Sequence, residues 1–239
     1  MGMNDSAMND LAPAGVLRAA INFGNPVLAR READGSPGGI TADLARHLAG
    51  ALDARVQFVS YEQAGDVFAG LDQDAWDICF LAIEPVRAAR IAFTEPYLTI
   101  EGVYLVPPSS PLRHAGEVDR DGTRIGVIAG SAYDLFLTRA LAQASLVRLP
   151  GPAQVLEALL GARVDLIAGV RPALETDARR VPGSRLLPEA FMSIRQAMGT
   201  PRERAAGAAF IARFIEDAKR SGLLGELFER NRVEGGSLA

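Results

Sequence analysis

A glutamate and an arginine share one short segment that could bind a carboxylate. Glu84 and Arg87 lie in the run EPVRAAR, directly after the apolar strand predicted over Ile78–Ile83. Ligands of open α/β sheets bind beyond the carboxyl ends of the strands, and the planar guanidinium of arginine matches the geometry of a carboxylate. Arg87 is therefore a candidate ligand contact. The alternative is a solvated arginine, or one that forms a surface ion pair with Glu84.

A glycine and a serine form a second candidate site. Gly130 and Ser131 follow the strand predicted over Ile125–Ile128. Gly130 permits a tight turn, and Ser131 suits the N-cap of a helix predicted to run to Ala144. Free amides at such a helix end attract anions, although Ser131 could equally act as a cap alone. The segment matches neither the phosphate-binding loop nor the dinucleotide glycine pattern.

A third candidate segment contains a second arginine. Gly169 and Arg171 follow the strand predicted over Val164–Ala168, which belongs to a second series of elements. They therefore lie beyond the carboxyl end of a strand in the second series, the same position that Arg87 has in the first series. Arg171 is either a second anion contact or a surface residue that begins a helix together with Pro172.

The composition is typical of a folded protein with a substantial core. The 239 residues are 49% hydrophobic and 23% charged, which allows one large domain or two lobes. The net charge is −4, and the Lys and Arg residues are scattered along the chain. This pattern argues against a nucleic-acid surface and favours a small-molecule partner.

Cysteine and histidine are too few for several kinds of site. Cys79 is the one cysteine, and His47 and His114 are the only histidines. No internal disulfide can form, and we expect Cys79 to be a buried thiol. One cysteine and two histidines are too few to make a zinc site or a histidine-based catalytic triad a strong candidate. We therefore expect no metal site, and the leading interpretation of the chain, a binding protein, requires no cofactor and no catalytic residue.

The N-terminal residues indicate where in the cell the chain is expected to be located. The first nine, MGMNDSAMN, lack the basic start and apolar core of a secretory signal. No apolar run approaches the ~18 residues that cross a bilayer. We expect no membrane insertion and a cytoplasmic location for the chain as written. A removed export signal would leave the same start and would indicate the periplasm.

Short apolar strands alternate with amphipathic helices, which predicts an α/β fold with largely parallel sheets. One series runs from the strand Leu17–Phe23 to the strand Ile78–Ile83, and a second runs from Gly102–Val106 to Val164–Ala168. The C-terminal part is helical, and it begins at the capping box Thr200–Glu203.

Several short segments occur in one order along the chain. They are Asp34-Gly35, Gly39–Ala45, Trp76-Asp77, Arg87 six residues before Phe93–Tyr97, Gly130-Ser131 and Val164-Asp165. In this order, from Leu17 onward, the chain resembles the type II solute-binding proteins of the bacterial extracellular family 3, which includes amino-acid receptors of ABC importers. The resemblance implies a two-lobed type II periplasmic-binding-protein fold, whose central hinge of two crossover strands lets the lobes close on a small molecule.

The resemblance also implies boundaries and ligand contacts. We expect an N-terminal tail over 1–16, lobe 1 over 17–99 and 195–239, and lobe 2 over 100–194. By the resemblance, Arg87 binds the α-carboxylate, amides near Ser131 and Ala132 assist from lobe 2, and the loop with Phe23 and Asn25 lines the cleft. The full predicted ligand-binding set is Phe23, Asn25, Glu84, Arg87, Ser131, Ala132, Gly169 and Arg171.

Two departures from the family pattern change the expected ligand charge. Family members usually carry Ser or Thr three residues before the arginine, where this chain has Glu84. The Asp that holds the ammonium, a few residues past the position of Asp165, is replaced by the run Gly169–Arg171. Either Glu84 binds the ammonium of an amino acid, or Glu84 pairs with Arg87 or Arg171 and the ligand is an anion.

Three functions follow from this resemblance. The first is non-catalytic binding of a small amino acid or carboxylate, as the solute-binding component of an ABC-type importer with a permease partner, or as a cytoplasmic derivative. The alternative is a lyase similar to the cyclohexadienyl and arogenate dehydratases, with Glu84 as the acid; adjacent Arg87 opposes this role because it favours the ionised form. The third, the effector half of a LysR-type regulator, lacks the N-terminal helix-turn-helix.

Overall fold

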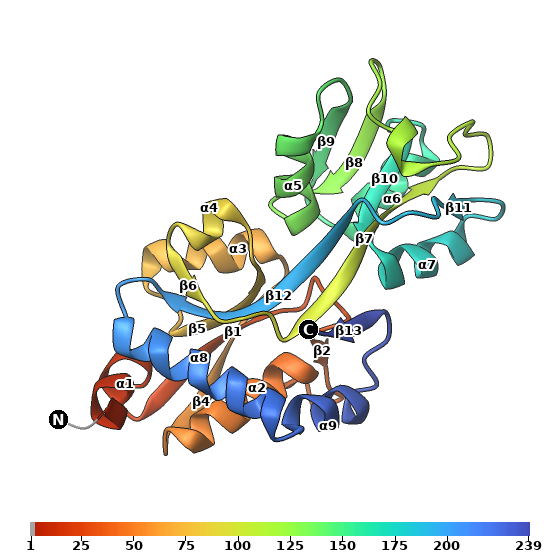
Figure 1. Ribbon diagram of the computed structural model, residues 1–239. Helices are drawn as coiled ribbons and strands as arrows, with labels where there is room; N and C mark the ends of the chain where they lie inside the picture. The colour runs from red at the N-terminus through yellow and green to blue at the C-terminus, as the bar shows by residue number, and fades with distance from the viewer. Residues whose placement is uncertain (1–2) are drawn as a thin grey trace. The chain divides into compact units, whose positions relative to one another are not determined.

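The computed structural model describes residues 3–239. These form two compact units: unit 1 runs to Thr99 and resumes at Arg195, and unit 2 is Ile100–Ile194. The chain passes between the units twice, within strand β7 (Leu98–Val106) and within strand β12 (Met192–Pro201) (Figure 1). Both units combine a sheet with helices, so the predicted α/β class is confirmed.

The sheet of unit 1 is parallel at its centre. Its strands lie in the order β4 (Arg55–Tyr61), β1 (Val16–Asn22), β5 (Ile78–Ala82) and β12, with β6 (Ile91–Phe93) added to β12. β1 is parallel to β4 and β5, whereas β12 is antiparallel to β5. Every residue of β5 is buried, as its nearly unbroken apolar sequence predicts for a strand covered on both faces.

Helices cover this sheet. They are α1 (Met3–Leu11), α2 (Ile40–Ala51), α3 (Ala64–Ala69), the 3-10 helix η1 (Gly70–Gln73), α4 (Pro85–Ala88), α8 (Ala205–Arg220) and α9 (Leu223–Arg230). A core cluster joins Trp76 and Val67 to Cys79 and Leu81 of β5. A short hairpin, β2 (Arg30–Arg31) with β3 (Pro37–Gly38), precedes α2. In residues 3–239, no helix is both long and apolar enough to cross a membrane.

The expectation of an N-terminal tail over 1–16 is wrong for the residues that the structure describes; Met1 and Gly2 lie outside them. Helix α1 packs against α8 (Figure 1). Both Ala7 and Leu11 of α1 are fully buried. The Asp10 carboxylate accepts a hydrogen bond from the Gly207 amide at 2.9 Å. It thereby caps the first turn of α8, whose own N-cap residue, Arg204, makes no side-chain cap.

Unit 2 contains a further group of sheet strands. Its strands lie in the order β7, β10 (Leu166–Val170), β8 (Arg124–Ile128) and β9 (Ser145–Leu149), with β11 (Arg185–Leu186) added to β7. β8 is parallel to β10 and β9, and β10 is antiparallel to β7. Its helices are η2 (Ala115–Glu117), α5 (Ala132–Ala140), α6 (Pro152–Leu160) and α7 (Arg171–Arg180). The core lies between α6 and the sheet, around Val155, Leu159 and Ile167.

Helix α5 ends four residues before the predicted Ala144 because a distant carboxylate takes the next amides. Asp119 accepts hydrogen bonds from the backbone N–H groups of Ala142, Gln143 and Ala144, each at 2.8 Å. These amides no longer continue the helix, and their hydrogen bonds hold the pKa of Asp119 below its usual value.

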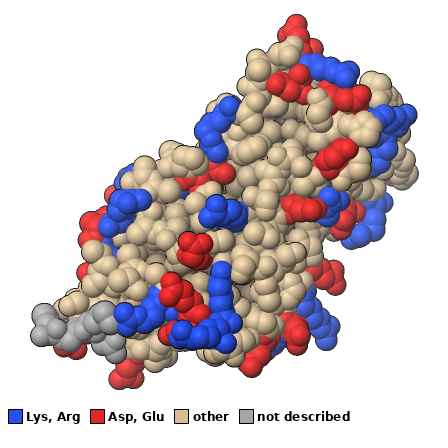
Figure 2. Space-filling view, viewed as in Figure 1, with Lys and Arg blue, Asp and Glu red and all other residues tan. Residues whose placement is uncertain are grey.

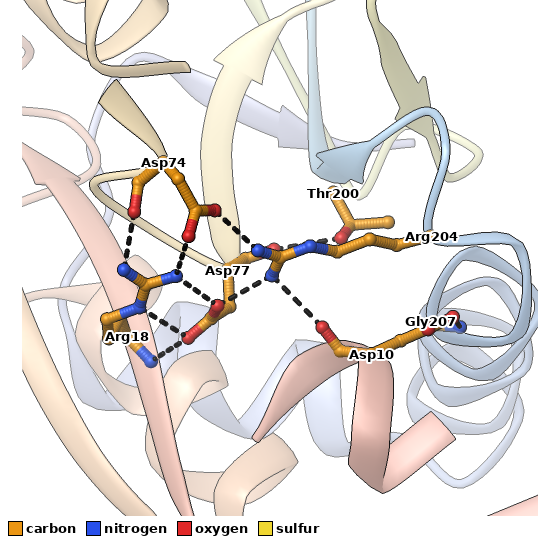
Figure 3. Close-up of polar contacts among 7 residues, drawn as sticks. All are labelled: Asp10, Arg18, Asp74, Asp77, Thr200, Arg204 and Gly207. Atoms are coloured by element: carbon orange, nitrogen blue, oxygen red, sulfur yellow. Dashed lines mark hydrogen bonds and ion pairs between the residues drawn. The ribbon is translucent and has the colours of Figure 1, made fainter. Parts of the chain in front are cut away.

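An arginine–aspartate clamp joins two strands of unit 1 (Figure 3). Asp77, just before β5, accepts hydrogen bonds from the backbone amide of Arg18 at 2.7 Å and from its Nε at 3.1 Å and Nη2 at 2.7 Å. Arg18 also donates to the carbonyl of Asp74. Arg204 adds a second guanidinium, with its Nη1 2.6 Å from the Asp77 carboxylate.

Unit 2 repeats the clamp with other residues. Asp165, just before β10, accepts from the backbone amide of Arg124 at 2.8 Å and from its Nε at 3.1 Å and Nη2 at 2.8 Å. Arg124 also donates to the carbonyl of Ala162 at 3.1 Å. Asp74 and Ala162, each three residues before the aspartate, both have positive φ values, 46° and 52°. The units therefore share one local design, although only unit 1 adds a second arginine.

A histidine–glutamate pair ties two loops of unit 2 together. His114 Nδ1 lies 2.8 Å from Glu189 Oε1, and the Ala115 amide donates to Glu189 Oε2 at 3.0 Å. The hydrogen bond with Glu189 raises the pKa of His114 above 6.5 and holds the pKa of Glu189 below 4.5. The histidine contribution to stability is complete below pH 6.5 and is lost as the pH rises through the folded-state pKa. The glutamate contribution is present above pH 4.5 and is lost as the pH falls.

We therefore expect Glu189→Gln to return the pKa of His114 towards 6.5, as measured by NMR titration of the ring protons. Glu157→Gln, which removes an exposed carboxylate of α6, serves as the matched control and leaves the His114 titration unchanged. An unaltered His114 titration in Glu189→Gln would contradict the pairing.

Candidate functional site

Glu84 and Arg87 lie in a single turn at the carboxyl end of β5. Glu84 is the N-cap residue of α4, Pro85 occupies the first helical turn, and Arg87 lies in the last. Glu84 is only 3% exposed and Arg87 only 1%. The alternative interpretation of a solvated arginine or a surface ion pair is therefore wrong: both charged groups are buried.

The Arg87 guanidinium is held by the chain around it. Its Nη1 donates to the carbonyl of Ala82 at 3.2 Å, at the last residue of β5. Burial lowers the pKa of Arg87 to about 10, and the negative charge of Glu84 opposes this shift. Arg87 therefore remains protonated at neutral pH, with Glu84 as an electrostatic partner.

The loop after β1 lies at the same sheet edge. β1 and β5 pair in parallel, with Ala19 opposite Ile78, so Phe23, Asn25 and the turn of α4 all follow carboxyl ends of neighbouring strands. Asn25 is buried, and its Oδ1 accepts from the Val27 amide at 3.2 Å.

A cation that the sequence analysis missed covers Phe23. The Arg31 guanidinium carbon lies 4.0 Å from the centre of the Phe23 ring, a cation–π contact, and Arg31 also pairs with Glu62. The sequence carries no signal for this contact, because Arg31 reaches the ring from the separate hairpin strand β2.

In unit 2, Ser131 is the N-cap of α5, as predicted. Its hydroxyl accepts from the Asp134 amide at 3.1 Å. The Asp134 carboxylate accepts from the Gly130 amide at 2.9 Å, and the Ser131 amide donates to the Ile128 carbonyl at 3.2 Å. The expectation of free amides at Gly130 and Ser131 is therefore wrong, because the chain supplies its own acceptors. Ala132 opens the helix and is 8% exposed.

Arg171 begins helix α7 with Pro172, as one of the two interpretations predicted. Its Nε lies 2.5 Å from the Glu101 carboxylate on β7. Sequence analysis missed Glu101, which is 70 residues away and reaches Arg171 only because β10 pairs with β7. Gly169 has a packing role, since a Cβ there would lie 3.1 Å from the side chain of Leu174.

Other reactive side chains are sparse. Cys79 is buried, as predicted, and burial raises the pKa of its thiol well above the usual range, so it remains protonated at neutral pH. Within residues 3–239, no group of three or more His, Cys, Asp or Glu is placed to hold a metal ion. On the face drawn in Figure 2, acidic and basic side chains are intermixed, with uncharged areas between them.

The structure thus brings four of the eight predicted ligand-binding residues, Phe23, Asn25, Glu84 and Arg87, to one edge of unit 1. Residues 17–232 match the bacterial extracellular solute-binding proteins, family 3. The chain is a member of this family.

Solved structures share the fold of this family member. A mutant of ArgBP from T. maritima superposes with a TM-score of 0.79 at 19% identity, covering 95% of this chain and 100% of that one. A putative binding component of an ABC transporter from Wolinella succinogenes, complexed with lysine, gives 0.75 at 20% identity, with 91% and 95% covered. An ancestral amino acid-binding protein described as a precursor of cyclohexadienyl dehydratase gives 0.76 at 18% identity, with 93% and 97% covered. The predicted type II periplasmic-binding-protein fold is confirmed. A search of curated proteins finds no match.

Proposed function

We propose that this family 3 protein binds a small amino acid or carboxylate without transforming it, and that Arg87 binds the ligand carboxylate. The observation that carries this proposal is the Arg87 guanidinium, which is 1% exposed, fixed by the Ala82 carbonyl and located at the carboxyl end of β5. Phe23 and Asn25 follow the neighbouring strand and are proposed to line the same site. From unit 2, Ser131, Ala132, Gly169 and Arg171 remain predicted contacts.

The related structures support the class of ligand. The Wolinella succinogenes protein was solved with lysine, and the ancestral protein is described as amino acid-binding. By the usual role of the family, we propose that this chain delivers its ligand to an ABC permease.

The lyase alternative places Glu84 as a general acid. Its position at the site and the description of one neighbour as a dehydratase precursor favour it. Against it, the Wolinella succinogenes structure is described as a putative binding component of an ABC transporter, and the ancestral precursor is itself described as amino acid-binding.

A thermal-shift screen tests the proposal. The purified chain is heated with the common amino acids, dicarboxylates, keto acids and prephenate, since a ligand that binds the native state raises its melting temperature. We expect a saturable shift with an amino acid or carboxylate, confirmed by calorimetry, and recovery of the ligand unchanged. Conversion of prephenate would establish the lyase instead, and the absence of any shift at millimolar ligand would contradict the proposal.

A further inference from the structure

We propose that Glu84 binds the ammonium group of the ligand, so that one turn of unit 1 recognises both charges of an α-amino acid. This inference rests on the proposed function and narrows it, because it selects zwitterionic head groups over dicarboxylates and over acids without an amine.

The backbone of α4 places the two side chains together. Glu84 is the N-cap and Arg87 is the third helical residue, a separation at which side chains share one helix face. The Glu84 carbonyl accepts from the amides of Arg87 at 2.9 Å and Ala88 at 2.8 Å, which fixes the turn. The Glu84 carboxylate does not cap the helix that it precedes, so its position is not explained by helix capping.

Burial gives this pair its selectivity. Glu84 and Arg87 are both almost fully buried, so their charges are poorly screened by water and each strongly affects any charge that a ligand brings. The two side chains together carry no net charge. A carboxylate that approaches Arg87 alone meets the negative charge of Glu84, whereas an α-amino acid supplies a positive group for Glu84 at the same time.

Matched ligand pairs test the inference. Calorimetry measures the affinity of the wild-type chain for each common L-amino acid and for the corresponding 2-hydroxy acid, in which a hydroxyl replaces the ammonium. We expect the best amino acid to bind at least about tenfold more tightly than its hydroxy acid, the scale of a charge-assisted hydrogen bond. Glu84→Gln should lower the affinity for the amino acid by at least about tenfold. The affinity for the hydroxy acid should stay the same or rise.

Two further variants separate recognition from folding. Glu84→Asp retains the charge and should preserve the preference for the amine, which shows that the site remains folded. Glu95→Gln removes an exposed carboxylate of unit 1 and should change neither affinity.

The outcomes distinguish this inference from the proposed function. If the wild-type chain binds hydroxy acids or dicarboxylates as tightly as amino acids, or if Glu84→Gln leaves the preference intact, the ammonium role is wrong while carboxylate binding stands. If the wild-type chain binds neither kind of ligand, the proposed function fails and this inference with it.

Discussion

Asp77→Asn is expected to lower the free energy of unfolding by about 3 kcal/mol, the scale of breaking a buried ion pair from one side. The Asp77 side chain is 1% exposed and accepts hydrogen bonds from two guanidinium groups, those of Arg18 and Arg204 (Figure 3). Asparagine retains the shape but removes the charge, and its amide nitrogen cannot accept from an arginine. The two partly buried guanidinium groups then keep only the exposed carboxylate of Asp74 as a shared counter-charge. Urea unfolding followed by circular dichroism measures the change.

The equivalent change in unit 2 is its natural control. Asp165→Asn likewise removes the negative charge and one of the two acceptor oxygens that face Arg124, but the Asp165 side chain is 43% exposed and, within residues 3–239, has no second arginine partner. Water screens this pair, so we expect a loss below about 1 kcal/mol. If Asp77→Asn and Asp165→Asn lowered the free energy of unfolding equally, burial of Asp77 and its contact with Arg204 would not add to stability, and the prediction would be wrong.

Local sequence patterns predicted the parallel strands of both units and the position of Glu84 and Arg87 after one of them. The apolar run Ile78–Ile83 corresponds to β5, in which every residue is buried, because burial on both faces leaves no alternation in the sequence. A residue that follows such a strand lies at the sheet edge whatever the rest of the chain does. For this reason the position of Glu84 and Arg87 at a strand end could be predicted from the sequence, whereas their contact with a ligand stays a prediction.

Contacts between distant residues were not predictable. Helix α1 is stabilised by burying Ala7 and Leu11 against α8, nearly 200 residues later in the chain. The early end of α5 depends on the carboxylate of Asp119. Arg171 forms its ion pair with Glu101, which lies 70 residues earlier in the chain. A single acidic residue, whether in a loop as Asp119 or on a strand as Glu101, carries no sequence pattern that identifies its partner. The burial of Glu84 was equally invisible, because a charged residue beside an arginine is usually on the surface.

Arg87→Ala is expected to weaken ligand binding by more than about 1.5 kcal/mol, or over tenfold, since it removes a charge-assisted contact to the ligand carboxylate. The structure adds a second effect. Glu84 is 3% exposed, so its charge loses a buried partner and the free energy of unfolding should also fall. Binding is therefore measured by calorimetry at a temperature where circular dichroism shows the variant folded.

Arg90→Ala is the matched control for this variant, because it removes a neighbouring arginine that pairs with Asp72 and is 47% exposed. It should change neither affinity nor stability by more than about 1 kcal/mol. The double variant Arg87→Ala with Glu84→Gln removes both buried charges, so it should regain stability relative to Arg87→Ala without regaining affinity. Unchanged affinity in a folded Arg87→Ala variant would show that the arginine only stabilises the turn, and the ligand carboxylate would have to be bound elsewhere.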